Sequence, residues 1–299
     1  MKQWALFAAV LLLLTAALIW SEVTKAQAPV GPEPILNLIA DSQRELTRLP
    51  VAFAPLPDAE EITIGEQIEL SYVANFPTSS DDDRAIEAYV QKVGGLDAAH
   101  AYRKLPYRFH YIPSRDFVNA FALPGGAVFI GGGLMSLMDS EDELAAVLGH
   151  EIEHIDRYHC AERIQVETAL HRTPAAGLIA LPVEVFVAGY SKSQELEADR
   201  EGTKLAAISG YSPQGAIQLF EAFERFNPER RVRAGSPQEE LSNIALQSLF
   251  GYFRSHPSDG ERIDQIRKML ADGQLPERRN MRPIKLKPAA LSRAGAVSR

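Results

Sequence analysis

The chain has the composition of a folded protein rather than of a disordered or repetitive one, since 46% of its 299 residues are hydrophobic and 23% are charged. A formal net charge of -8 argues against nucleic acid as a general partner. The single cysteine, Cys160, excludes an intramolecular disulfide, and we expect it to be a small buried residue rather than a metal ligand.

The first 28 residues are predicted to be a targeting segment. Lys2 precedes the uncharged run 4–20, and Ala26-Gln27-Ala28 has the small-x-small pattern that signal peptidase cuts. The run is long for a signal peptide and at the lower limit for a membrane-spanning helix. Residues 1–28 are therefore either a cleaved signal peptide or an N-terminal membrane anchor, and we expect an exported chain, in the periplasm or on the extracytoplasmic face of a membrane.

The next part of the chain alternates breaks with helical patterns. Residues 29–56 are predicted to be a proline-rich linker and a short helix, and residues 55–63 a further connection. Helices are predicted over residues 64–76 and 84–94. Three aspartates, residues 81–83, could be taken for a metal cluster, but we interpret them as capping and charging the first turn of the second helix.

Three runs with strand character follow, at residues 107–112, 117–123 and 127–131. Turns that contain proline and glycine separate them, so the runs predict a small meander. The three glycines 131–133 lack the spacing of a phosphate loop and instead predict a tight turn from the last strand into a short helix over residues 134–138.

An H-E-x-x-H motif, formed by His150, Glu151 and His154, is the most informative stretch. It lies in a predicted helix, residues 141–155, that Asp139 or Ser140 can cap, with Ser140 and Glu143 in the spacing of a capping box. Side chains four residues apart share a helical face, so the two histidines can bind one zinc ion. Glu151 flanks that position and is predicted to be the general base that takes a proton from a zinc-bound water. The competing interpretation is a buried helix with two incidentally spaced histidines.

A catalytic zinc site needs a third protein ligand and an open position for water. Residues 191–209 predict a charged amphipathic helix in which Glu195 and Asp199 lie one turn apart on the same face. Glu195 is the best candidate for the third ligand, and Asp199 can then accept the free N–H of a ligand histidine. Without the histidine motif, the same run would be interpreted as a solvated helix face. The expected cofactor is one Zn²⁺ per chain.

The remainder of the chain is predicted to be helical, with a charged loop and a tail. Residues 175–189 are apolar but too short and too polar to span a membrane, so we expect them to be buried or interfacial. Residues 273–299 are basic and are predicted to be a disordered, solvated tail, with attraction to an anionic membrane surface as the alternative. The predicted helices cover residues 212–226, 241–254 and 260–271, with the loop at 225–240.

Several motifs in order make the sequence similar to a known family. They are the segments 119–125, 128–134, 143–154 and 195–199, followed by His256-Pro257 and Arg262-Ile263. Over residues 57–267 the chain resembles metallopeptidase family forty-eight, the gluzincins that include the CAAX prenyl protease, the HtpX heat-shock protease and periplasmic proteases of outer-membrane quality control.

The resemblance implies a zincin-like metallopeptidase domain over residues 57–272, α+β and mainly helical, with a small antiparallel or mixed sheet and an H-E-x-x-H active-site helix. It implies zinc bound by His150, His154 and Glu195, with Glu151 as the general base. It also implies a segment by the cleft that holds substrate as an added strand. That segment consists of Asn119, Ala120, Phe121 and Ala122.

Two further residues are expected at the site. His256 lies in a His-Pro loop that approaches the metal in the similar periplasmic members, so we favour a site role, as a hydrogen-bond donor to the oxyanion or a reversible plug of the zinc. The alternative is a purely structural role, in which His256 caps the following helix. Arg262 is expected to bind a substrate carbonyl or to stabilise that loop. The family often has glycine at the position of Glu153, and this difference does little to weaken the resemblance.

We therefore expect an exported zinc metalloendopeptidase that cleaves unfolded or misassembled proteins in envelope quality control. The chain lacks the several hydrophobic segments of the prenyl-processing members, which argues against CAAX cleavage. One alternative is a chaperone-like protein that grips unfolded chains along residues 117–123, with structural zinc and a permanently closed site. A third hypothesis is a membrane-surface scaffold, held by residues 1–28 and the basic tail.

Overall fold

The computed structural model describes residues 56–171, 190–226, 260–276, 280–286 and 288, which all belong to one compact unit, Val51–Arg299. The predicted targeting segment 1–28, the apolar run 175–189, the helix 241–254 and His256 lie outside the described residues. Among the helices that the structure describes, none is both long and apolar enough to cross a membrane.

Two helices open the unit, α3 (Asp58–Asn75) and α4 (Asp81–Ala98). The predicted connection 55–63 is wrong from Asp58 onward, because Pro57 is the N-cap of α3 and acidic residues fill its first turn, where the helix dipole favours them. At the start of α4, Ser80 and Asp83 form a capping box. The three aspartates thus charge the first turn as predicted, but the N-cap is Ser80 and only Asp83 takes part in the capping.

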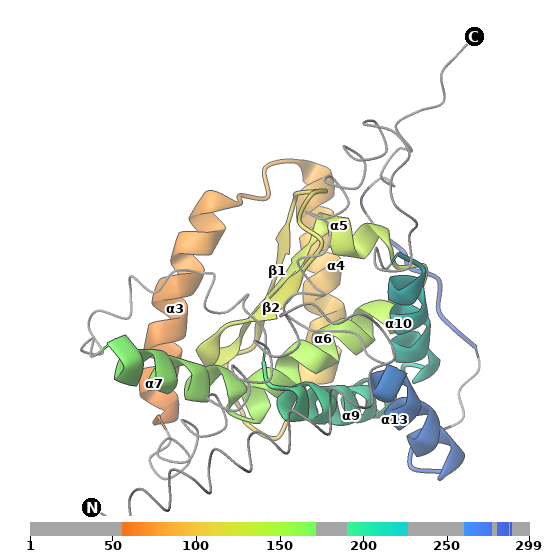
Figure 1. Ribbon diagram of the computed structural model, residues 1–299. Coiled ribbons are helices and arrows are strands. Elements are labelled where there is room, and N and C mark those ends of the chain that lie inside the picture. The colour runs from red at the N-terminus through yellow and green to blue at the C-terminus, as the bar shows by residue number, and fades with distance from the viewer. Residues whose placement is uncertain (1–55, 172–189, 227–259, 277–279, 287, 289–299) are drawn as a thin grey trace, which may run out of the picture. The chain divides into compact units, whose positions relative to one another are not determined.

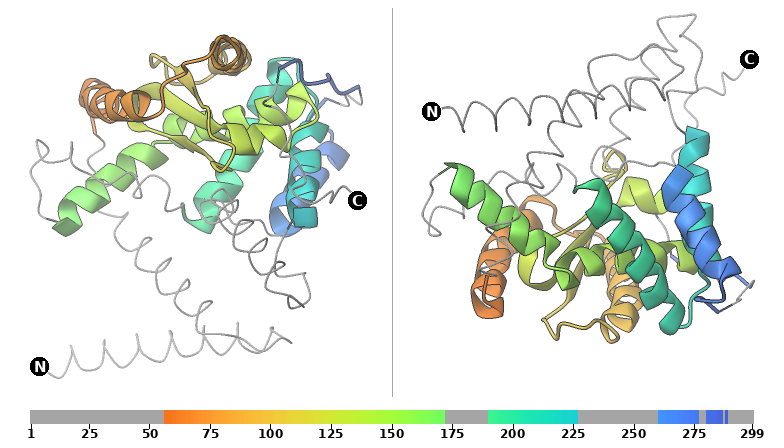
Figure 2. Two further views of the ribbon diagram at one scale, coloured as in Figure 1. Left: turned by 90° about the horizontal axis from the view of Figure 1, so that it is seen from above. Right: turned by 60° about the horizontal axis from the view of Figure 1, so that its bottom comes forward.

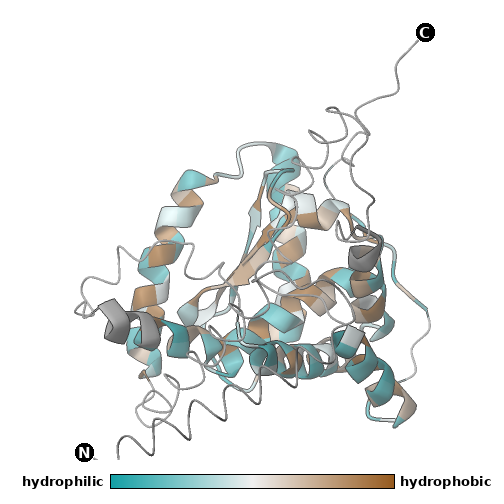
Figure 3. Ribbon diagram, in the orientation of Figure 1, coloured by the Kyte–Doolittle hydropathy of each residue, from teal (hydrophilic) through white to brown (hydrophobic). Residues whose placement is uncertain are grey.

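The sheet contains β1 (Arg108–Ile112), β2 (Ala120–Ala122) and β3 (Ala127–Gly131) in the order β1-β3-β2. β3 pairs in parallel with β1 and antiparallel with β2, so the predicted meander is wrong. Turns that contain proline and glycine mark where strands end but not which strands pair, and here β3 rather than β2 pairs with β1. Figure 3 shows the apolar stretch that β2 and β3 form.

A short turn, η1 (Pro124–Gly126), joins β2 to β3 and requires glycine. Gly125 has φ 79° and Gly126 has φ 121°, values that side chains rarely permit. After β3, α5 (Gly132–Ser136) begins directly at the strand's end, so the chain passes from strand to helix at the glycines as predicted, but the helix starts and ends two residues earlier than the predicted 134–138.

The two faces of the sheet pack against different helices. Phe121 and Phe129 join Ile68 and Tyr72 of α3 in a smaller apolar cluster. Alternate residues such as Val128 face the larger core, which is formed with α4, α6, α9 and α10 (Figure 1). The described part of the chain is thus mainly helical with a small mixed sheet, as the sequence predicts.

The central helix is α6 (Glu141–Asp156), which is buried at all its positions and lies between the sheet and α9 (Figure 2). The predicted bounds of this helix and of the helices over residues 191–209, 212–226 and 260–271 hold within about two residues, but the sequence patterns predict no helix over residues 159–171, where the structure has one. The later helices are α7 (His159–His171), α9 (Lys192–Ile208), α10 (Gln214–Phe226) and α13 (Gly260–Ala271).

Residues 280–286 correct the prediction of a disordered tail over 273–299. The backbone N–H of Glu141, at the start of α6, donates to the carbonyl of Arg282 at 2.8 Å, and the N–H of Arg282 donates to the carboxylate of Asp142 at 2.6 Å. Basic composition favours solvation of the side chains, but these bonds involve the backbone and do not depend on side-chain charge.

Candidate metal centre

The H-E-x-x-H helix begins where its capping residues predict. The Ser140 side chain accepts a hydrogen bond from the N–H of Glu143 at 3.1 Å, and the Glu143 carboxylate accepts one from the N–H of Ser140 at 2.7 Å. Further along α6, His150 and His154 share one face, and their Nε2 atoms lie 3.0 Å apart. The histidine side chains are 5% and 0% exposed, so the pair lies inside the molecule.

Glu195 on α9 joins this pair. Its Oε2 lies 3.4 Å from Nε2 of His150, and its Oε1 lies 3.6 Å from Nε2 of His154. α9 begins with its own capping box, between Ser191 and Gln194, so Glu195 stands in the first turn. The structure therefore brings the three predicted ligands together from two helices.

Two glycines let these helices approach closely. A Cβ on Gly202 would lie 2.6 Å from the backbone nitrogen of His150, and a Cβ on Gly149 would lie 2.8 Å from the carbonyl oxygen of Gly202. Both distances are too short for real side chains, so only glycine allows this crossing of α6 and α9. The crossing determines how near Glu195 comes to the histidines.

The geometry of the three side chains fits a zinc ion. A tetrahedral zinc with nitrogen and oxygen ligands at the usual distances separates neighbouring ligand atoms by roughly 3.3 Å. Here the two histidine nitrogens lie 3.0 Å apart, and they lie 3.4 and 3.6 Å from different oxygens of the Glu195 carboxylate. Two imidazoles and one glutamate form one of the standard ligand sets of catalytic zinc. The donor types and their spacing therefore both suit this metal.

Two more charged residues support the ligands. Nδ1 of His150 lies 2.8 Å from Oδ1 of Asp199, which is the contact predicted between this carboxylate and a ligand histidine. Arg262 of α13 donates from both Nε and Nη2 to this carboxylate, and its Nη2 lies 3.4 Å from Oε2 of Glu195. Its side chain is only 2% exposed. The contact of Arg262 with a substrate carbonyl stays a prediction, since the described contacts place this residue behind the ligand carboxylates.

The buried charges at the centre shift each other's pKa. Burial alone would lower the pKa of His150, but hydrogen bonds and charges from Asp199 and Glu195 raise it to about 10. Burial would raise the pKa of Asp199, but Arg262 and His150 hold it below its usual range. The metal-free centre is thus negative enough to keep a proton on His150, and a divalent cation can replace that proton.

The other predicted site residues lie on neighbouring elements. Glu151 is fully buried in α6. The Oδ1 of Asn119 accepts the backbone N–H of Ala120 at 3.0 Å, and β2 follows at one edge of the sheet, in contact with α6. Cys160 is fully buried and lies outside the cluster of possible ligands, as predicted.

His159 and Tyr190 are contacts of His154 that the sequence interpretation missed. Nδ1 of His159 lies 3.0 Å from Nδ1 of His154, and the Tyr190 ring stacks on the His154 ring with centroids 3.8 Å apart. Helical periodicity could not reveal His159, because α6 ends before it and α7 begins with it. No spacing rule relates Tyr190 to the motif.

Comparison with known proteins places the chain in a family. The profile described as Peptidase family M48 matches residues 80–270. The beta-barrel assembly-enhancing protease of Escherichia coli K12 is 28% identical over 234 residues, which cover 70% of this chain and 46% of that protein. The putative beta-barrel assembly-enhancing protease of Vibrio cholerae is 29% identical over 296 residues, covering 89% and 55%.

A third relative is the mitochondrial metalloendopeptidase OMA1 of Arabidopsis thaliana, 28% identical over 174 residues that cover 56% of this chain and 31% of that protein. The chain spans about half the length of the two bacterial relatives, 46% of the Escherichia coli protein and 55% of the Vibrio cholerae protein. The family profile nevertheless covers more than half of the chain and includes both helices of the metal centre. The chain therefore belongs to peptidase family M48.

Proposed function

We propose that the chain is a zinc-dependent endopeptidase with one Zn²⁺ held by His150, His154 and Glu195. The observation that carries this proposal is the set of three buried side chains from two helices, in which the two histidine nitrogens lie 3.0 Å apart and lie 3.4 and 3.6 Å from the two oxygens of Glu195. Membership of the M48 family supports it, and so does the negative potential that raises the pKa of His150.

When bound there, zinc would act as a Lewis acid, polarising the scissile carbonyl and making a water molecule acidic enough to lose a proton near neutral pH. Glu151 accepts that proton and then passes it to the leaving amine. Asp199 holds the Nδ1 proton of His150, which leaves Nε2 of that ring to face the metal. Arg262 keeps the Asp199 carboxylate ionised and in place.

Asn119 and β2 (Ala120–Ala122) are proposed to bind the substrate. β2 lies at the edge of the sheet and contacts α6, so a peptide added along it would run beside the motif helix. Pairing through backbone hydrogen bonds does not depend on the side chains of the substrate, so it suits unfolded or misassembled proteins of varied sequence. His256 lies outside the described residues, and its role at the site stays a prediction.

An exported location and a role in envelope quality control complete the proposal. Residues 1–28 have the pattern of a signal peptide or anchor, and that segment would also provide any membrane association. Two bacterial relatives are named for enhancing beta-barrel assembly. The acidic composition supports protein rather than nucleic acid as the substrate.

Elemental analysis of zinc, paired with casein cleavage on the same samples, tests the proposal. We expect one zinc per wild-type chain, loss of zinc in Glu195→Ala, and retained zinc without cleavage in Glu151→Gln, because glutamine cannot accept a proton. Glu151→Gln that cleaves casein at the wild-type rate would contradict the mechanism. Wild type that holds no zinc but still binds unfolded casein would favour the chaperone-like alternative.

A further inference from the structure

His159 is a buried histidine that the mechanism above does not use. Its side chain is 1% exposed, and its Nδ1 lies 3.0 Å from Nδ1 of His154. Its other ring nitrogen, Nε2, lies 3.5 Å from Oε2 of Glu197 on α9. Three side chains therefore run in series, from a proposed metal ligand through His159 to a carboxylate that is 35% exposed.

The positions of the protons follow from the contacts of His154. Its Nε2 faces the other two ligand atoms, Nε2 of His150 and Oε1 of Glu195. A histidine that binds a metal is neutral and binds through its unprotonated nitrogen, so Nδ1 of His154 carries the proton. The facing Nδ1 of His159 must accept that proton's hydrogen bond. His159 then carries its own proton on Nε2, which faces Glu197.

The local backbone holds His159 in this position. α6 ends at Asp156, and Tyr158 has φ 63°, a left-handed conformation that is rare for an aromatic residue. The guanidinium of Arg103 lies 3.9 Å from the centre of the Tyr158 ring and stabilises the turn. α7 then begins with His159, whose ring centroid lies 5.1 Å from that of His154.

We propose that His159 is a positioning residue of the metal centre. By accepting at Nδ1, it holds His154 in the tautomer and the ring orientation that bind the metal, while Glu197 holds His159 in the complementary tautomer. The two histidine ligands are thus supported differently, His150 by the carboxylate of Asp199 and His154 by a neutral imidazole. This inference rests on the proposed function, since it requires a metal at the centre.

The test measures Zn²⁺ affinity of the metal-free protein by competition with a chromophoric chelator, in the variants His159→Asn and His159→Gln. Asparagine places its side-chain oxygen near the position of Nδ1, whereas glutamine places its polar group near Nε2. We expect His159→Gln to bind zinc about 10–100-fold more weakly than wild type, the usual effect of losing an outer-shell partner, and His159→Asn to stay within about threefold. The visible spectrum of the Co²⁺-loaded protein should change in the glutamine variant only.

His110→Gln is the matched control, because His110 also contacts a glutamate, Glu69, but lies on β1 away from the ligands. It should bind zinc like wild type. Thermal unfolding of the metal-free variants should show equal stability for His159→Asn and His159→Gln, so that a difference in affinity reports the acceptor position.

Equal zinc affinity of His159→Asn and His159→Gln, whether high or low, overturns the inference, because the acceptor at Nδ1 would then have no effect. Wild type with zinc and an unaffected His159→Gln overturns this inference alone. Wild type that binds no zinc overturns the proposed function together with it.

Discussion

His150, Glu195, Asp199 and Arg262 pack together at the proposed metal centre, and each side chain is 5% exposed or less. Among these four, the two carboxylates are balanced by Arg262 and by His150 when it carries a proton. Buried charges are tolerated only when each has a partner, and an isolated one costs several kcal/mol. This balance gives a physical reason for Arg262 to lie against the carboxylates.

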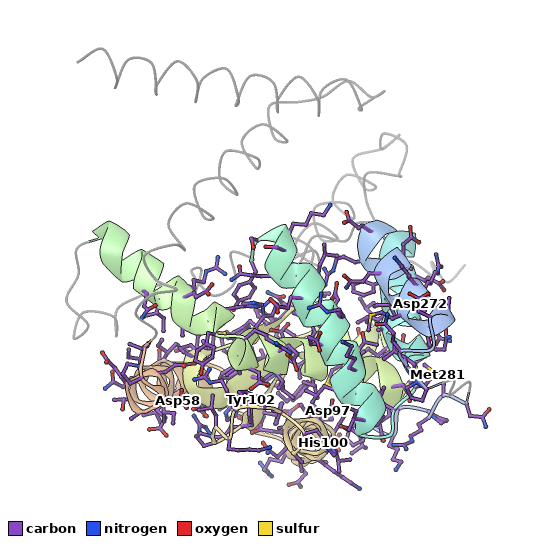
Figure 4. The ribbon with its side chains drawn as sticks, turned by 90° about the horizontal axis from the view of Figure 1, so that it is seen from below. Asp58, Asp97, His100, Tyr102, Asp272 and Met281 are labelled. Atoms are coloured by element: carbon purple, nitrogen blue, oxygen red, sulfur yellow. The ribbon has the colours of Figure 1, made fainter. Side chains whose placement is uncertain are left out.

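The carboxylate of Asp97, which lies near the C-terminal end of α4 and outside the group of possible metal ligands, is also fully buried (Figure 4). Burial raises its pKa from 3.8 to about 8. Between these values the folded chain keeps the proton while the unfolded chain releases it. Raising the pH through this window therefore destabilises the fold, by up to about 1.4 kcal/mol per pH unit.

Asp97→Asn should remove this dependence, because the amide does not titrate. We expect the variant to gain stability over wild type as the pH rises from 5 to 8, in urea unfolding followed by circular dichroism. Asp82→Asn, on the exposed first turn of the same helix, is the control and should not show the trend. A constant difference between Asp97→Asn and wild type across this range would show that Asp97 does not titrate as described.

Among the helices, the crossing of α6 and α9 is the contact on which the metal centre depends. In Gly202→Ala, the new methyl group would meet backbone atoms of α6, which cannot move aside as a side chain can. We expect the helices to separate and Glu195 to move from the histidines, with zinc affinity reduced at least about 10-fold, as for other losses of ligand orientation. The chelator competition described for His159 measures this.

Gly95→Ala on α4 is the matched control, because a Cβ there meets nothing within 4 Å. It should leave zinc affinity unchanged and raise stability by roughly 0.5–1 kcal/mol, the helix propensity gained over glycine. A Gly202→Ala protein with wild-type zinc affinity would show that the crossing tolerates a wider spacing.

Elements whose ends carry local signals could be predicted from the sequence. The capping boxes at Ser140 and Ser191 mark the starts of α6 and α9, and both helices begin where these residues indicate. The start of α3 was missed because its N-cap is a proline without a side-chain hydrogen bond. The strand order was missed because pairing between β1 and β3 joins distant residues, which turn signals do not encode.

In the metal centre too, local sequence patterns predict some of the residues and not others. The four-residue spacing predicts that His150 and His154 share a face, and the E-x-x-x-D run with the family resemblance indicates Glu195 and Asp199. No local pattern predicts the contact of His159 with His154, because it depends on a turn at the end of α6. Contacts made between elements are thus the part that the sequence does not reveal.

For the molecule as a whole, the C-terminal residues 280–286 connect the end of the described chain to the start of α6. Besides the bonds at Glu141 and Asp142, the N–H of Lys285 donates to the hydroxyl of Tyr89 at 3.3 Å, and that hydroxyl donates to the Glu141 carboxylate at 2.8 Å. Residues 280–286 are far from the metal ligands in sequence, and these bonds hold α4 and α6 together.

Truncation after Pro276 should therefore destabilise the protein, because it leaves the buried carboxylate of Asp142 and the first N–H of α6 without these partners. At about 1 kcal/mol for each hydrogen bond lost, we expect a loss of roughly 2–4 kcal/mol in the free energy of unfolding. Truncation after Pro288 keeps residues 280–286 and should leave stability and zinc affinity unchanged. If both truncated chains unfold at the wild-type urea concentration, the segment contributes nothing to the fold, and the basic tail is no more than the solvated extension that its composition suggests.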